Sequence, residues 1–324
     1  MGDRITSENV HRLRITHQID LSNPAVNMLP AQAIYWLADG ETLRIGSSRG
    51  IYHYYVPERR MTFSLSFEQF QYDLMGFSPT YALGAKVSRI HIWDIAEGQM
   101  LGECQFTGHL NRMYVSPDEK WFLAVEDFNF AFTHKATLTA WNFPRLLPRF
   151  NIKYPDRIAG VGISPDGGRL ALGIWSKDGN PYKTFIWDSN SLRELQHFAG
   201  QSTWTAAFSP DGQRLAVMFF ETYGQPRLYN NGFQIWNMEQ NTVQQLEPFD
   251  KSYRSRFDCC FSPSGSLLIT NDLMVFDVAS GQLVAHLPSS IYLDRHEPMP
   301  LAFNHQETYL ATIENKQVVI REVF

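Results

Sequence analysis

Short apolar stretches alternate with tight polar turns along the whole chain. In the clearest example, the apolar segment TWTAAF ends at Phe208 and is followed by Ser-Pro-Asp-Gly and then by RLAVMFF. In such a turn, proline presets φ, aspartate bonds its own backbone and glycine takes the left-handed exit. The near-continuous apolar run that follows indicates a strand buried on both faces. The pattern therefore predicts antiparallel strands joined by short turns, with no helical periodicity.

This strand–turn–strand unit recurs at a mean spacing of about 44 residues. The copies begin at Trp36, Phe77, Val115, Ile163, Phe208, Phe261 and Phe303. The spacing is typical of four-stranded propeller blades, each of which buries its apolar face on its neighbours. We predict a single all-β domain over residues 1–324, a seven-bladed β-propeller of four-stranded antiparallel blades. The predicted blades span residues 34–66, 75–106, 113–152, 158–198, 204–247, 257–288 and 299–324. Six or eight blades also fit, because other propellers share the turn motif.

The two ends of the chain predict how the ring closes. The seventh copy ends in QVVIREVF, its third strand, with no fourth strand after it. Residues 10–19 alternate apolar and polar side chains like a strand, yet they precede the first copy. Pairing these two segments would complete the last blade and cover a sheet edge that otherwise promotes aggregation. We therefore predict that the N-terminal strand closes the last blade.

The ends of the third strands resemble those of WD40-repeat β-propellers. Two copies end in Trp-Asp, and three others end in Trp-Asn or Phe-Asp; these pairs begin at Trp93, Trp141, Trp187, Trp236 and Phe276. One Gly-His pair, at residues 108–109, precedes Trp141, as in the Gly-His…Trp-Asp signature of that family.

The resemblance extends over almost the whole sequence and implies roles for several residues in the fold. It implies a hydrogen-bond relay of His109, Asp127 and Trp141 in the third blade. It also implies that Trp93, Trp141, Trp187 and Trp236 are structural residues buried between blades. The seventh copy has Ile-Arg-Glu where Trp-Asp would stand, so the signature is incomplete there.

Composition narrows the functional classes. The sequence is 44% hydrophobic with a net charge of -5, so it can bury a large core and offers no global attraction for nucleic acid. Three cysteines are too few and too scattered for a disulfide framework. No apolar run approaches the roughly 18 residues that a membrane span needs. We expect a soluble cytoplasmic protein that binds no membrane, and its charge disfavours nucleic acid as a partner.

The sequence carries no catalytic or cofactor-binding motif. It lacks a G-x-S-x-G elbow, a G-x-G-x-x-G loop and a P-loop, and its histidines do not fall at metal-ligand spacing. The repeated aspartates recur with the blade, which indicates a role in the fold rather than in catalysis. We therefore predict no catalytic residues, no metal and no cofactor.

Three consecutive copies carry long insertions after their second strand. The insertions are EDFNFAFTHK from Glu126, SKDGNPYK from Ser176 and ETYGQPRLYNNG from Glu221. In these propellers, second-to-third and fourth-to-first connections share one face. The latter include KYPDR from Lys153, PFDKSYRSR from Pro248 and PSSIYLDRHEP from Pro288. Ordering extra loop residues costs entropy, and Tyr and Arg dominate interface hot spots, so this face is the candidate binding surface.

The candidate partner-binding residues are the aromatic and basic side chains of these segments. They are Phe128, Phe130, Lys153, Arg157, Tyr182, Tyr223, Arg227, Tyr229, Lys251, Tyr253, Arg254, Arg256, Tyr292 and Arg295. Alternatively, the aromatics pack their own hairpins and the arginines form a solvated rim.

The predicted function is that of a non-catalytic scaffold that binds a protein or peptide partner as a subunit of a larger assembly. A lone propeller with no effector domain acts only through what it binds. Two alternatives stay open: an enzyme or small-ligand binder that uses the central channel, and a phosphate or nucleic-acid reader that uses the basic loops. Steep salt dependence would favour the second.

Overall fold

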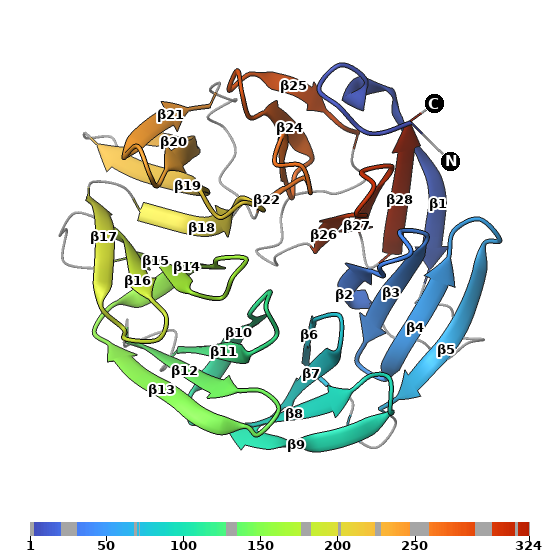
Figure 1. Cartoon of the computed structure of the whole chain (residues 1–324), viewed down its shortest axis with the longest axis horizontal. Coiled ribbons are helices and arrows are strands. Elements are labelled where there is room, and N and C mark those ends of the chain that lie inside the picture. The colour runs from blue at the N-terminus through green and yellow to red at the C-terminus, as the bar shows by residue number, and fades with distance from the viewer. Residues whose placement is uncertain are drawn as a thin grey trace.

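The computed structural model describes residues 3–20, 31–67, 70, 72–127, 135–175, 183–199, 202–223, 228–246, 259–288, 300–314 and 317–323. These residues form seven four-stranded antiparallel sheets arranged as blades around a ring (Figure 1). The first strand of each blade lies nearest the centre of the ring and the last lies at its rim. The predicted seven-bladed, all-β propeller is confirmed.

Blades 1 to 3 follow one another in sequence. Blade 1 comprises β2 (Ala31–Trp36), β3 (Thr42–Ser47), β4 (Gly50–Tyr55) and β5 (Arg60–Ser66). Blade 2 comprises β6 (Leu74–Phe77), β7 (Tyr81–Lys86), β8 (Arg89–Asp94) and β9 (Gln99–Gln105). Blade 3 comprises β10 (His109–Val115), β11 (Trp121–Asp127), β12 (Ala136–Asn142) and β13 (Leu147–Tyr154).

Blades 4 to 6 continue the same order. Blade 4 comprises β14 (Arg157–Ile163), β15 (Arg169–Trp175), β16 (Lys183–Asp188) and β17 (Glu194–Ala199). Blade 5 comprises β18 (Ser202–Phe208), β19 (Arg214–Tyr223), β20 (Leu228–Asn237) and β21 (Thr242–Gln245). Blade 6 comprises β22 (Cys259–Phe261), β23 (Leu267–Thr270), β24 (Met274–Asp277) and β25 (Leu283–His286).

Blade 7 joins the two ends of the polypeptide. It comprises β26 (Leu301–Phe303), β27 (Tyr309–Glu314), β28 (Gln317–Val323) and the N-terminal β1 (Leu13–Asp20), which follows the single turn η1 (Val10–Arg12). Strand β1 pairs with β28 from Leu13↔Val323 to Asp20↔Gln317. Figure 1 shows the two termini beside each other at this blade. Closure of the ring by the N-terminal strand is thus confirmed.

The Ser-Pro-x-Gly turns form as their sequence predicts. In blades 4, 5 and 6 the turn glycine donates its N–H to the carbonyl of the serine three residues earlier, and each glycine has a φ near +70°. Each of the three serines, Ser164, Ser209 and Ser262, is fully buried, and its hydroxyl accepts the N–H of the residue that opens the next strand. The motif therefore fixes where the second strand of the blade begins.

The core lies between the blades. Each of seven apolar clusters combines buried residues of two neighbouring blades, so every blade-to-blade contact has its own cluster. The cluster between blades 6 and 7 also contains Ile5, Val10 and Leu13 of the N-terminal segment. The ring is stable because each blade has its two faces covered by its two neighbours.

The four tryptophans that end third strands differ in burial. Trp141 and Trp236 are buried, as predicted, whereas Trp93 and Trp187 are half-buried. Trp93 Nε1 donates to the Tyr72 hydroxyl at 2.8 Å, so the surroundings of this indole are not wholly apolar.

Trp236→Ala is expected to lower the free energy of unfolding by about 3–5 kcal/mol, the range for large aromatic truncations in a core. The ring is 2% exposed and packs on Phe198 of blade 4. Trp187→Ala is the matched variant, and its loss should be smaller because part of that ring already contacts water. Urea denaturation of both proteins measures the difference, and equal losses would contradict the structural assignment.

Candidate functional site at the inner strands of blades 3 and 4

Most of the predicted partner-binding residues lie outside the described residues. These are Phe128, Phe130, Tyr182, Arg227, Lys251, Tyr253, Arg254, Arg256, Tyr292 and Arg295. The structure places the backbone of Tyr223 and Tyr229 in β19 and β20, and it describes Lys153 and Arg157 completely.

Two of the expected loops are shorter than the sequence suggests. Lys153 lies in β13 and Arg157 begins β14, so the connection between blades 3 and 4 is only residues 155–156. Much of the long insertion from Glu221 continues the hairpin of β19 and β20, which pair as far as Tyr223↔Leu228. Pairing with a neighbouring strand satisfies backbone groups that a loop would leave to water, and this favours the longer strands.

The Gly-His turn of blade 3 is held by a carboxylate that the sequence analysis does not identify. Glu126 is 1% exposed, and its Oε2 accepts the N–H groups of Thr107 and Gly108, each at 2.9 Å. Its Oε1 accepts the Thr139 hydroxyl at 2.9 Å. A signal is present, because Glu126 is an acid at the end of the apolar run WFLAV, where burial requires a partner.

The implied relay of His109, Asp127 and Trp141 remains a prediction. His109 and Asp127 are paired across β10 and β11 through their backbones, but the side chain of Asp127 is outside the described part of the structure. His109 is exposed, and the buried Trp141 stacks on Phe122 with ring centroids 5.0 Å apart.

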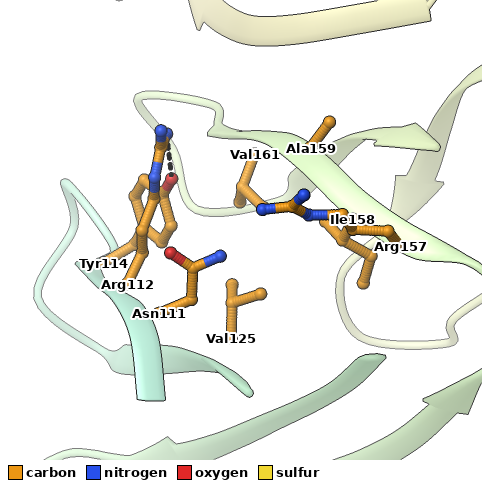
Figure 2. Close-up of a pocket in the computed structure, with 8 residues that line it drawn as sticks. All are labelled: Asn111, Arg112, Tyr114, Val125, Arg157, Ile158, Ala159 and Val161. Carbon is orange, nitrogen blue, oxygen red and sulfur yellow. Dashed lines mark hydrogen bonds between the residues drawn. The ribbon is translucent and has the colours of Figure 1, made fainter. Parts of the chain in front are cut away.

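A small pocket lies between the inner strands of blades 3 and 4 (Figure 2). Strand β10 supplies three polar lining residues, Asn111, Arg112 and Tyr114. Strand β14 supplies Arg157, and the remaining lining residues are the apolar side chains Val125, Ile158, Ala159 and Val161. Arg157 is therefore a predicted partner-binding residue that the structure places in this pocket.

Irregular strand pairing brings these side chains to the pocket. The register shifts between Leu110 and Arg112 in β10, and between Ile158 and Gly160 in β14, so Asn111 and Ala159 are bulged residues. The same shift occurs at Gln32 in β2 and Trp204 in β18, so blades 1, 3, 4 and 5 share the bulge, whereas the described pairs of blades 2, 6 and 7 show no such shift. A bulge redirects side chains. The identity of the bulged residue therefore distinguishes one blade from another.

The polar lining consists mainly of hydrogen-bond donors. Arg112 Nη1 donates to the Tyr114 hydroxyl at 3.3 Å, and this pair forms one side of the pocket. Figure 2 shows the Arg157 side chain reaching from β14 toward the side chains of β10, with the Asn111 amide below it. The lining includes no His, Cys, Asp or Glu. The arrangement is thus able to bind an anion but provides no general base, nucleophile or usual metal ligand.

A second and larger hollow lies on blade 1. It has a volume of about 280 Å³ and is lined by Leu37, Thr42, His53, Tyr55, Arg60 and Thr62. Arg44 Nε donates to His53 Nε2 at 3.3 Å, and burial together with this charge lowers the pKa of His53. The imidazole is therefore neutral near pH 7, and Arg44 itself bonds the carbonyls of Ser78 and Pro79, so these groups serve the contact between blades 1 and 2.

The described part of the molecule presents neither a metal-binding cluster nor a membrane-spanning helix. No group of three or more His, Cys, Asp or Glu side chains there could hold a metal ion. None of its helices is long and apolar enough to cross a membrane.

The fold resembles that of solved structures, although the sequence itself finds no match. No protein-family model matches the sequence, and no curated protein matches it either. A structure of hydrazine synthase from Kuenenia stuttgartiensis superposes with a TM-score of 0.68 at 15% identity, over 90% of this chain and 95% of that one. The β-propeller domain of Cps50 (Swd1) from Myceliophteria thermophila superposes with a TM-score of 0.62 at 14% identity, over 91% and 97%.

The protein has the fold of a seven-bladed β-propeller. At these identities the likeness concerns the fold alone. One of the two similar structures is a hydrazine synthase and the other is a Cps50 (Swd1) domain, and one fold can serve many functions. The function of this protein therefore has to be inferred from its own sites.

Proposed function

We propose that this protein is a non-catalytic scaffold that binds a protein partner through one face of the propeller, as a subunit of a larger assembly. The supporting observation is the hairpin of β19 and β20. The hairpin of β15 and β16 in blade 4 ends, within the described residues, at the pair Ile174↔Lys183. The blade 5 hairpin continues past the equivalent point by four pairs, from Phe220↔Asn231 to Tyr223↔Leu228.

The additional pairs lengthen this hairpin by roughly 13 Å at the rise of an antiparallel strand. A paired hairpin is stiffer than a loop of the same length, so it loses less entropy when a partner binds. Tyr223 and Tyr229 lie near its tip, and tyrosine provides large contact area with few rotatable bonds.

The pocket lies on the same side of the ring as this tip. Because the strands of each blade are antiparallel, first strands begin where second strands end. Arg112 and Arg157 lie near the starts of β10 and β14, and Tyr223 ends β19. The proposed binding face therefore combines a projecting hairpin with a cationic pocket nearer the centre of the ring.

A combined Tyr223→Ala, Tyr229→Ala, Arg254→Ala variant is expected to lose the native partner, because it removes the aromatic and guanidinium groups of the proposed face. Affinity capture from the native source, followed by mass spectrometry, measures the loss, and a thermal melt verifies that the variant is folded. The melting temperature is expected to stay within a few degrees of wild type.

The matched control is Glu97→Ala with Glu239→Ala. Both glutamates are exposed and lie in third-to-fourth-strand turns on the opposite face. Retention of the partner by the triple variant, with loss in the control, would assign binding to the other face and contradict the proposal.

A further inference from the structure

We propose that the turn between β7 and β8 is a docking point, at which Val87 enters an apolar pocket of the protein partner and Lys86 meets an acidic group at the edge of that pocket. This inference rests on the proposed function and adds the chemistry that the partner presents. Two observations carry it. Val87 has a left-handed backbone conformation, and its side chain is 84% exposed, the largest exposed fraction among the large apolar residues that the structure describes.

The backbone at Val87 is strained. Its φ is +58°, a region in which Cβ of an L-residue comes too close to the following carbonyl oxygen. A β-branched side chain is a clear outlier there. Among the eight non-glycine residues with a positive φ in the described part of the structure, Val87 is the single β-branched one. Glycine or asparagine at this position would avoid the strain.

The blade itself does not require this conformation. In blade 1, a turn of equal length at residues 48–49 joins β3 to β4, and neither of its residues has a positive φ. In blade 2, residues 87–88 make the equivalent connection between β7 and β8. The strain is therefore a property of this particular turn and not of the propeller architecture.

Comparable residues are held by contacts within the molecule. Leu146, Leu192 and Leu273 also have a positive φ, and each packs on an apolar cluster between blades. None of the seven clusters formed by the described residues includes Val87. Strained residues persist where surrounding contacts fix them, and they are frequent where ligands are held. We therefore expect the partner to supply the apolar contact that this molecule does not give Val87.

The turn lies on the proposed binding face. Second strands end on that face, as β19 does at Tyr223, and Lys86 ends β7. Figure 1 shows blade 2 on the far side of the ring from blade 5, which carries the projecting hairpin. A partner that contacts both features has to span the ring, so it is a folded protein rather than a short peptide.

The charges beside Val87 define the edge of the partner's pocket. Arg89 is engaged, because its Nη1 donates to both carboxylate oxygens of Glu103 at 2.9 and 3.0 Å. Lys86 is half-buried and pairs with Arg89 across the turn through the backbone, and no ion pair among the described residues includes its ammonium group. A carboxylate at the edge of the pocket would be complementary to this charge.

A protein surface fits these features better than a membrane does. Stable membrane attachment takes two strong signals, such as an acyl chain and a polybasic cluster, whereas this turn offers one apolar side chain beside one lysine. The net charge of -5 also opposes binding to anionic lipids. A preformed pocket removes the whole isopropyl group from water, and a tight turn loses little entropy when it binds.

The probe for the test is the protein that the wild-type chain captures from its native source, identified by mass spectrometry and then produced in pure form. Val87→Thr keeps the branched shape but adds a hydroxyl group. It is expected to weaken binding of the probe about tenfold, because the pocket would bury an unpaired polar group. Val87→Ile remains apolar and should bind within about threefold of wild type. Biolayer interferometry measures each affinity.

Val87→Asn distinguishes docking from a role in folding. Asparagine tolerates a positive φ, so this variant is expected to melt about 2 °C above wild type while its affinity for the probe falls about tenfold. A residue that serves only the fold would change stability and binding in the same direction.

Val243→Thr is the matched control. Val243 is 49% exposed in β21, an outer strand at the rim of blade 5, so the same substitution there should change binding by less than about twofold. Lys86→Gln is expected to weaken binding about threefold at low salt and less at high salt. Unchanged binding by Lys86→Gln would contradict the acidic edge of the pocket.

Two results would overturn the docking point. One is unchanged binding of the probe by both Val87→Thr and Val87→Asn. The other is flotation of the wild-type protein with phosphatidylserine vesicles that Val87→Thr abolishes, which would indicate a lipid surface instead. If the Val87 variants bind normally while the hairpin variant loses the partner, the scaffold function stands and the docking point alone fails. Capture of no protein by the wild-type chain contradicts the scaffold function itself.

Discussion

A protein that lacks residues 1–20 is expected to melt far below the full-length protein and to aggregate. The deletion removes β1, which forms the outer strand of blade 7 along the whole length of β28. The exposed edge of β28 would then offer unpaired N–H and C=O groups to another molecule.

The same segment also contributes to the core. Ile5, Val10, Leu13 and Ile19 are at most 7% exposed, and burying such side chains contributes about 1.5–3 kcal/mol each. Their sum is comparable to the whole stability of a typical domain, about 5–15 kcal/mol. Outside the strand, Ile5 donates its N–H to the Glu307 carbonyl, and Arg4 forms an ion pair with Glu307 at 2.6 Å.

Circular dichroism during heating, together with light scattering, measures this effect. A synthetic peptide of residues 1–20, added to the truncated protein, should restore part of the lost melting temperature because it can pair again with β28. A truncated protein that melts within a few degrees of the full-length protein would show that β1 is dispensable for closure.

Glu314→Gln is expected to lower the free energy of unfolding by about 3–5 kcal/mol, because it leaves a buried arginine without its counter-charge. Arg321 and Glu314 are each 1% exposed, and Arg321 Nη1 lies 2.6 Å from Glu314 Oε1. Arg321 also donates to the Thr312 hydroxyl and to the Pro288 carbonyl, each at 3.0 Å. The ion pair lies within blade 7, and the bond from Arg321 to the Pro288 carbonyl connects it to the segment that leaves blade 6.

Urea denaturation of two further variants distinguishes the cost of an unpaired buried charge from the cost of a lost contact. Combining Glu314→Leu with Arg321→Met removes both charges, and this variant should recover most of the loss because apolar side chains replace the pair without a desolvation cost. Glu58→Gln removes one partner of an exposed pair with Arg60, and it should cost at most about 1 kcal/mol. A loss below about 1 kcal/mol in Glu314→Gln would contradict the structural role of this pair.

The candidate site is only partly visible in the sequence. The sequence predicts Arg157 on the binding face because it follows a connection between blades, although it lies in a strand rather than in a loop. It does not indicate Arg112, Asn111 or Tyr114, because β10 has no insertion and its residues have the pattern of an ordinary inner strand. In the sequence, Glu126 is the first residue of the predicted loop. In the structure it lies within β11, which ends at Asp127, and it bonds the turn before β10.

The sequence by itself determined the features that depend on local chemistry and repetition. The Ser-Pro-x-Gly turns set the start of the second strand in blades 4, 5 and 6, and the spacing of the seven copies set seven blades. The alternation in residues 10–19 predicted the missing strand, which the structure has at Leu13–Asp20 after the turn Val10–Arg12. These features follow from residues that are close in sequence or from the need to pair a free edge.

Only the tertiary structure decided which side chains meet across neighbouring blades. Arg112 and Arg157 are far apart in sequence and face one pocket because bulges in β10 and β14 redirect the residues around them. The burial of Trp236 but not of Trp187 likewise depends on what the adjacent blade packs against each ring. Such a contact depends on the strand register and on the side-chain volumes of both blades. The sequence pattern of one blade alone therefore does not determine it.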